Sequence, residues 1–174
     1  GTGCFDMNIS AELSSKSIRR EVYSSNVLVF IEGSDEKLKQ EYLVYSSHLD
    51  HLGVRGDGED NIYNGAYDNA AGIGAIIEIA KVISAMEVKP KRSIIFAAVT
   101  AEEKGLQGSS YYAKNPLVMK KNLVANINID MPYLGFPVAD LHAFGSEHSS
   151  LYSAVDTATS YLGIQFTPDP LPEE

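Results

Sequence analysis

Two adjacent carboxylates, Glu102 and Glu103, closely follow the apolar run Ser-Ile-Ile-Phe-Ala-Ala at residues 93–98. Such a run is typical of a strand that is buried on both faces. Neighbouring side chains of an extended backbone point to opposite sides, so both acids can be satisfied only if the chain turns or a cation lies nearby. Either the pair begins a solvated turn, or one carboxylate binds a metal ion while the other transfers a proton.

One histidine and three further acids occupy similar positions, at the ends of expected strands or at the start of an expected helix. They are His48, Asp50, Asp68 and Asp130. Taken singly, His48 is explained as a hydrogen-bonded polar residue, Asp68 as a helix N-cap and Asp130 as the start of a turn. Asp50 lies on the same side of an extended chain as His48, where it is either solvated or orients the imidazole. His51 points the other way in such a backbone and is assigned a structural or supporting role.

The elements that must position these side chains follow from hydrophobic periodicity. Strands are expected at residues 26–31, 41–47, 93–98, 123–130 and 138–144, and helices at residues 68–86, 106–113 and 147–162. Residues 6–24 alternate loosely, which predicts edge or hairpin strands, whereas residues 52–67 predict a long irregular loop. Because strands alternate with helices, the class is α/β, with a largely parallel mixed sheet and helices on both faces.

The six candidate side chains are expected to meet at one edge of that sheet, because ligands of open α/β sheets bind beyond the carboxyl ends of the strands. A metal ion with an open coordination position polarises a carbonyl and lowers the pKa of bound water to about 7. Two ions about 3.5–4 Å apart need a carboxylate that bridges them and terminal ligands for each. Carboxylates accompanied by one or two imidazoles suit zinc.

The composition excludes several classes of partner and site. With 14 Lys and Arg against 23 Asp and Glu, the formal charge is -9, and no basic stripe is present that could neutralise nucleic-acid phosphates. Cys4 is the only cysteine, which excludes intrachain disulfides and thiolate zinc sites. No apolar run approaches the roughly 20 residues of a membrane span. The 174 residues are enough for one domain with a sizeable core.

Four motifs in this order closely resemble the two-zinc exopeptidases, the superfamily of secreted bacterial leucyl aminopeptidases and glutamate carboxypeptidase II. The motifs are His48-Leu49-Asp50, Gly65-Ala66-Tyr67-Asp68-Asn69-Ala70-Ala71-Gly72, Thr100-Ala101-Glu102-Glu103-Lys104-Gly105-Leu106-Gln107-Gly108-Ser109 and Asn128-Ile129-Asp130-Met131. The resemblance extends over residues 26–174, and the order and spacing of the motifs make it specific.

The resemblance implies a role for each candidate. His48 and Asp130 would be terminal ligands of one zinc, Asp68 would bridge two zinc ions, and Glu103 would be a terminal ligand of the second. Glu102 would be the general base, and Asp50 would fix the tautomer of His48. The implied reaction is release of the N-terminal residue of a peptide substrate by a zinc-activated water, in a secreted or periplasmic protein. The peptide bond between Asp68 and Asn69 would be cis.

One expected ligand is missing from the pattern. In the family, the second zinc takes a further histidine downstream of the position of Asp130, and His142 and His148 fall too early to match it. Residues 1–174 are therefore expected to be a C-terminally incomplete catalytic domain, with residues 1–24 as the tail of an upstream segment. Such a piece would hold at most one zinc tightly and would be inactive by itself, because the second site would lack an imidazole.

Three alternatives remain open on the same scaffold. The first two are a zinc carboxypeptidase and a glutaminyl cyclase, and because the cyclase would hold a single zinc, a metal count separates it. A non-catalytic binding ectodomain of the transferrin-receptor type would have lost most metal ligands. The candidate set in this sequence is largely present, which argues against that third alternative for the parent protein, though not for this piece of it.

Overall fold

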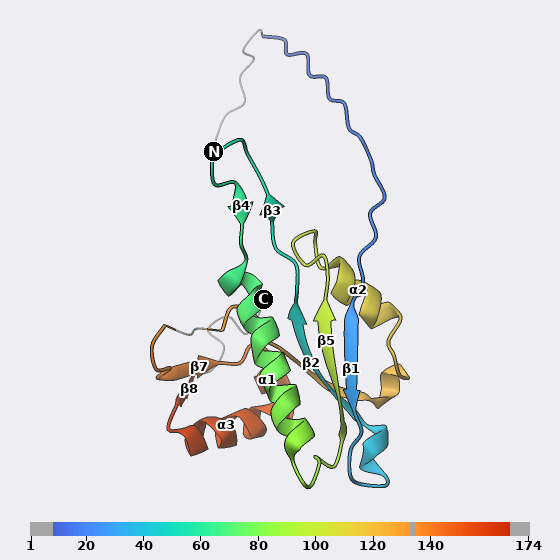
Figure 1. The fold of residues 1–174 in the computed structure, drawn as a ribbon, viewed down its shortest axis with the longest axis vertical. Helices are drawn as coiled ribbons and strands as arrows, with labels where there is room; N and C mark the ends of the chain where they lie inside the picture. The colour runs from blue at the N-terminus through green and yellow to red at the C-terminus, as the bar shows by residue number, and fades with distance from the viewer. Residues whose placement is uncertain (1–8, 133–134, 168–174) are drawn as a thin grey trace, which may run out of the picture.

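A four-stranded mixed sheet forms the centre of the computed structural model, which describes residues 9–132 and 135–167 (Figure 1). The strand order is β1-β5-β2-β6. The strands are β1 (Val27–Ile31), β2 (Tyr42–His48), β5 (Ser93–Val99) and β6 (Leu123–Asn128). Strand β2 is parallel to both β5 and β6, and only β1 runs antiparallel to β5 among these four. The predicted α/β class with a largely parallel mixed sheet is confirmed.

Strand β5 is buried on both faces because each face packs against apolar side chains. Ile94 and Phe96 pack against Ile76 of helix α1 (Ala71–Ala85). Ile95 and Ala97 lie in the cluster on the opposite face, against which Tyr112 of helix α2 (Gln107–Lys114) packs. The helices therefore cover both faces, as predicted from an apolar run without alternation.

The carboxyl ends of β2, β5 and β6 point to the same edge, since the three strands are parallel. His48, the last residue of β2, pairs with Val99, the last residue of β5. The chain turns after β5 and enters α2 through Gly108, whose backbone N–H donates to Thr100 O (2.9 Å). The side chain of Asn26 links Gly108 and Thr100, because it donates a hydrogen bond to Gly108 O and accepts one from Thr100 N.

Two sequence predictions in the N-terminal half are corrected. Edge or hairpin strands are predicted at residues 6–24, of which residues 6–8 lie outside the described residues. Residues 9–24 contain no helix or strand, so the prediction is wrong there. Their apolar side chains find no sheet to pack on, and Leu13 and Val22 are 94% and 86% exposed. Residues 52–67 are not wholly irregular, because β3 (Gly53–Val54) and β4 (Ile62–Tyr63) form a short antiparallel hairpin.

A kinked turn, η2 (Ala66–Ala70), with non-helical backbone angles at Asp68 and Asn69, leads from this hairpin into α1. The peptide bond between Asp68 and Asn69 is cis, as the sequence resemblance implies. Short 3-10 turns also occur at η1 (Leu38–Gln40), η3 (Lys120–Asn122) and η4 (Ser146–His148).

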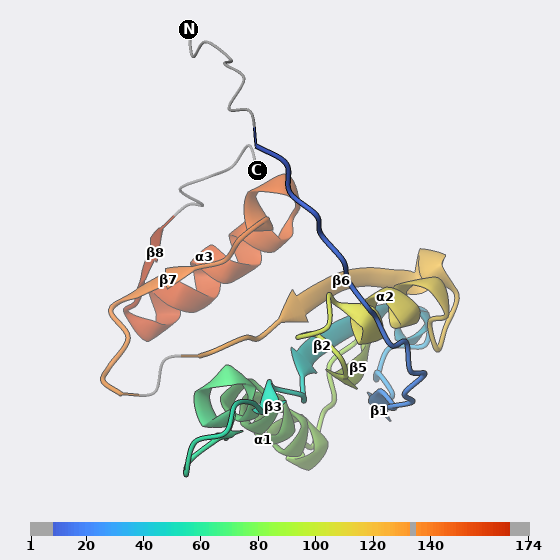
Figure 2. The ribbon, with the colours of Figure 1, turned by 90° about the horizontal axis from the view of Figure 1, so that it is seen from above.

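The last elements form a smaller layer beyond strand β6 (Figure 2). Strands β7 (Asp140–His142) and β8 (Gln165–Thr167) pair in parallel, and helix α3 (Leu151–Leu162) packs on β8 through the rings of Tyr152 and Phe166. Helix α3 ends at Gly163, whose positive φ of 68° suits the left-handed C-cap. Among the helices described, none has both the length and the apolarity that a membrane crossing requires.

The close approach of α2 to the end of β5 can be tested by adding one methyl group. A Cβ at Gly108 would overlap the backbone O and N of Thr100, so Gly108→Ala should lower the free energy of unfolding by about 1–3 kcal/mol. Gly74→Ala is the matched control, because a Cβ there meets nothing within 4 Å in the exposed part of helix α1. That variant should be more stable than wild type by about 0.5–1 kcal/mol. Urea denaturation of both variants tests the pair, and a Gly108→Ala protein as stable as Gly74→Ala would contradict the packing.

Candidate metal centre

A first group of three ligand atoms converges on the imidazole of His48. This side chain is 4% exposed at the end of β2, and its Nε2 lies 3.1 Å from Asp68 Oδ1 and 3.3 Å from Asp130 Oδ1. Asp68 comes from the turn before α1, and Asp130 follows β6 by two residues. Three segments that are distant in the sequence therefore place one nitrogen and two oxygens within 4.8 Å of one another.

The other ring nitrogen of His48 is held by the backbone rather than by a carboxylate. Nδ1 lies 3.0 Å from the carbonyl oxygen of Asp50 and 3.8 Å from Asp50 Oδ1. A carbonyl can only accept, so the contact fixes the proton on Nδ1 and turns the lone pair of Nε2 toward Asp68 and Asp130. Asp50 is the residue that the resemblance implies for this role, and it contacts the ring through its backbone carbonyl rather than its carboxylate, because the chain bends after β2.

The Asp50 carboxylate instead holds the turn that carries the acidic pair. Its Oδ1 accepts from Glu102 N (3.0 Å) and its Oδ2 accepts from Glu103 N (3.2 Å). Hydrogen bonds from two successive N–H groups to one carboxylate are charge-assisted and fix the direction of the backbone. Asp50 thus connects the segment after β2 to the segment after β5.

The electrostatics of the first group favour a positive charge. Burial lowers the pKa of His48, but the Asp130 carboxylate, the Asp50 carbonyl, Glu102 and Asp68 together raise that pKa above its ordinary value. A raised imidazole pKa reports an excess of negative charge around the ring. A divalent cation would satisfy the same excess with neutral His48 as its ligand.

A second group shares Asp68 with the first. His51 Nδ1 lies 2.9 Å from Glu103 Oε1 and 3.5 Å from Asp68 Oδ2. The two oxygens of Asp68 therefore face different groups, as a bridging carboxylate between two cations must. The second group has an imidazole from within this chain, whereas the sequence left it with Asp68 and Glu103 alone.

The fit of this second group to a metal is supported by an orphaned atom. His51 Nδ1 is buried and makes no hydrogen bond in the described structure, although two carboxylate oxygens lie within 3.5 Å of it. Buried polar atoms are normally paired. One nitrogen and two carboxylate oxygens around a common point are a donor set that zinc accepts, so the residues fit this ion.

The placement of His51 is what sequence reasoning missed. The prediction placed the strand at residues 41–47 but assumed an extended backbone as far as His51, which directed its side chain away from the site; β2 ends at His48 and the chain then turns. Once the backbone turns, the spacing of three residues returns His51 to the same edge. The available signal was the run His48-Leu49-Asp50-His51, which ends a strand and begins a Gly-rich segment.

The remaining histidines lie outside both groups, as expected. His142 pairs with Asp140 (3.3 Å) and His148 with Glu147 (3.4 Å), in the layer formed by the last elements. Neither residue belongs to a metal-competent cluster of the described residues.

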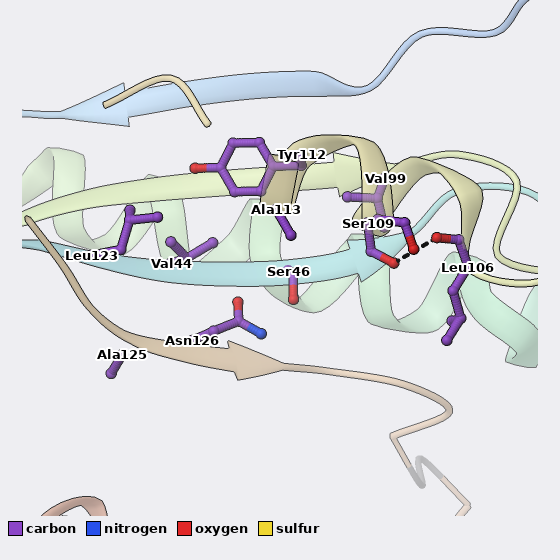
Figure 3. A pocket seen from close by; sticks show the side chains of 11 residues that line it. Val44, Ser46, Val99, Leu106, Ser109, Tyr112, Ala113, Leu123, Ala125 and Asn126 are labelled. Atoms are coloured by element: carbon purple, nitrogen blue, oxygen red, sulfur yellow. Dashed lines mark hydrogen bonds between the residues drawn. The ribbon is translucent and has the colours of Figure 1, made fainter. Parts of the chain in front are cut away.

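Glu102 lines a cavity of about 250 Å³ together with His48 and Asp130. It belongs to neither ligand group in the described structure, so its carboxylate remains available to accept a proton. Ser46, Leu106 and Asn126 also border a larger, mainly apolar space of about 520 Å³ between α2 and β6, shown in Figure 3. The small polar cavity therefore continues into apolar surface.

Comparison with known proteins gives a consistent result. Residues 26–174 match the model of peptidase family M28. The chain is 35% identical over 138 residues to the Aminopeptidase NAALADL1 of Mus musculus, covering 75% of this chain and 17% of that protein. A zinc aminopeptidase from Bacillus subtilis superposes with a TM-score of 0.62 at 26% identity, over 82% of this chain and 34% of that one. A Bacteroides thetaiotaomicron glutaminyl cyclase shares the fold, with a TM-score of 0.60 at 20% identity. The match covers 82% of this chain and 56% of that one. The chain thus spans about a sixth of the curated relative's length.

The contribution of His51 can be measured by metal binding. His51→Ala should weaken any zinc binding by the second group at least about tenfold, because losing even a partner that orients a ligand typically costs 10–100-fold in affinity. The zinc at the first group should keep its affinity, since none of its three ligands is changed. Chelator competition and zinc content report both sites, and His148→Ala is the matched control with a 68% exposed imidazole. Equal zinc content and affinity in the two variants would exclude His51 from the centre.

Proposed function

The chain belongs to peptidase family M28, and from this premise we propose that it carries the metal centre of a zinc aminopeptidase that removes the N-terminal residue of peptides. The observation that carries the proposal is the Asp68 carboxylate, whose two oxygens face two separate ligand groups with one imidazole in each. Glu102 lies in the adjoining cavity. This arrangement supplies ligands for two cations and a separate base.

Each residue has one task in the proposed reaction. His48, Asp68 and Asp130 would hold one zinc, and His51, Asp68 and Glu103 the other. Bound zinc supplies Lewis acidity toward the scissile carbonyl and lowers the pKa of water to about 7.

Glu102 accepts the proton of the attacking water and donates it to the leaving amine, which is general base catalysis followed by general acid catalysis. Asp50 keeps Glu102 and Glu103 in place through their backbone N–H groups.

The charge around the centre favours the amino end of a peptide over the carboxyl end. Among the residues that the structure describes, no lysine or arginine lines either cavity, whereas recognition of a terminal carboxylate calls for such a partner. A free α-ammonium group is compatible with the surrounding carboxylates. This argument and the similarity to aminopeptidases support the amino-terminal activity over a carboxypeptidase.

A glutaminyl cyclase is the second candidate, since one shares this fold. The family resemblance of the sequence implies a single zinc in such an enzyme, so the second ligand group around His51 favours the peptidase. We also propose that the elements described here belong to a single catalytic domain. We further propose that the protein acts outside the cytoplasm, in keeping with the secreted relatives that the sequence resembles.

The general base can be separated from the ligands by two conservative variants. Glu102→Gln should leave zinc content nearly unchanged and lower turnover of an aminoacyl amide at least about a hundredfold, as loss of a general base does. Glu103→Gln should instead lower the zinc content, because Glu103 belongs to the second ligand group. Both are measured on the protein expressed from its complete coding sequence. Full activity of Glu102→Gln would show that the roles are assigned wrongly.

The reaction type is tested with matched substrates on the wild-type protein. A leucyl peptide with a free amino group should be hydrolysed, and its N-acetylated form should not, because the acetyl group removes the positive charge. A peptide that begins with glutamine should lose that residue by hydrolysis rather than cyclise. Cyclisation without hydrolysis, together with one zinc per chain, would favour the cyclase.

A further inference from the structure

The side chain of Asn69 is buried beside the metal centre and uses its complete hydrogen-bonding capacity. It is 2% exposed. Its Nδ2 donates to Ser47 Oγ (3.0 Å) and to Ile129 O (3.1 Å). Its Oδ1 accepts from Gly72 N (3.0 Å) and Met131 N (3.2 Å). An amide has two donors and two acceptor lone pairs, so all four positions are filled.

Three of the four partners of this amide are chain neighbours of His48 and Asp130, two ligands of the first group. Ser47 precedes His48, while Ile129 and Met131 flank Asp130. Asn69 itself follows Asp68. The Asn69 side chain therefore connects the end of β2, the segment after β6 and the turn before α1. Each of these three segments contributes one ligand to the first group, and the connection lies next to that ligand.

The space around the amide is closely packed. A Cβ at Gly72 would overlap Asn69 Oδ1, Ser47 Oγ and the backbone oxygen of Ile129. Gly72, which has no Cβ, therefore allows the start of α1 to lie directly against these groups.

We propose that Asn69 is a positioning residue that holds His48, Asp68 and Asp130 in the geometry of a metal site before the metal arrives. The inference rests on the proposed zinc centre but not on the reaction carried out there. A preorganised set of ligands loses less conformational freedom on binding, and partners that orient ligands are typically worth 10–100-fold in metal affinity.

The test compares zinc affinity in variants that lose buried hydrogen bonds at different places. Asn69→Ala removes all four bonds at the centre. Ser47→Ala removes only the bond next to His48. The control is Ser93→Ala: Ser93 is equally buried and makes two hydrogen bonds, to Lys39 O and from Gly33 N, but lies at the opposite end of β5 from the centre. Each variant is made in the protein expressed from its complete coding sequence, and the metal-free form is checked for folding by circular dichroism.

Zinc alone is titrated against a chelator, and cobalt absorption reports the ligand geometry. Asn69→Ala should raise the Kd for zinc at the first ligand group at least about tenfold and alter the cobalt spectrum. Ser47→Ala should raise that Kd about fivefold, as expected for one hydrogen bond of about 1 kcal/mol. Ser93→Ala should lower the melting temperature of the metal-free protein while its zinc Kd stays within twofold of wild type.

Two results would overturn the inference. One is a folded Asn69→Ala protein with the zinc Kd of Ser93→Ala. The other, decisive where Asn69→Ala does not fold, is a Ser47→Ala protein with unchanged zinc Kd and cobalt spectrum. Failure of the proposed function looks different, since wild type would then bind zinc with the predicted dependence on Asn69 and yet release no N-terminal residue.

Discussion

The crowding of like charges at one edge of the sheet is the constraint on which the rest of the structure depends. The carboxylates of Asp68, Glu103 and Asp130 lie within a few ångströms of only two imidazoles, and the raised pKa of His48 reports the resulting negative potential. Unpaired charges in a partly buried site are costly unless a cation compensates them. The same potential that destabilises the site without metal is what would give it affinity for zinc. A fold that carries such a site must hold its segments firmly against their mutual repulsion.

The scaffold meets this requirement with a stiff strand and side chains that connect segments. Strand β5 is buried by α1 and α2 on its two faces, so its end is fixed in space. Asp50 then fastens the turn after β5, and Asn69 fastens the segments around the first ligand group. The non-glycine residues with positive φ in the described structure lie in these same segments, at Ala101, Leu106 and Met131. Such backbone conformations persist where the surroundings impose them, which is typical of functional sites.

The same scaffold serves more than one reaction, so the fold alone does not identify the chemistry. A zinc aminopeptidase and a glutaminyl cyclase superpose on this chain about equally well. The distinction lies in side chains at the edge of the sheet, above all in whether the second ligand group binds an ion. His51 bears directly on that question, because its buried Nδ1 faces Asp68 and Glu103 without a hydrogen bond.

The sequence by itself determined the class of the fold, the ends of its strands and the types of residue placed there. These features are local: the unbroken apolar run of β5 predicts burial on both faces, and parallel strands bring His48, Glu103 and Asp130 to one edge whatever the details. Tertiary structure decided where the side chains after each strand point. Asp50 holds the imidazole of His48 through its backbone carbonyl and the Glu102–Glu103 backbone through its carboxylate. His51 joins the second group because the chain bends after His48. The strands predicted from loose alternation are absent at residues 9–24 for the same reason, because a strand forms only where the folded protein provides a partner to pair with.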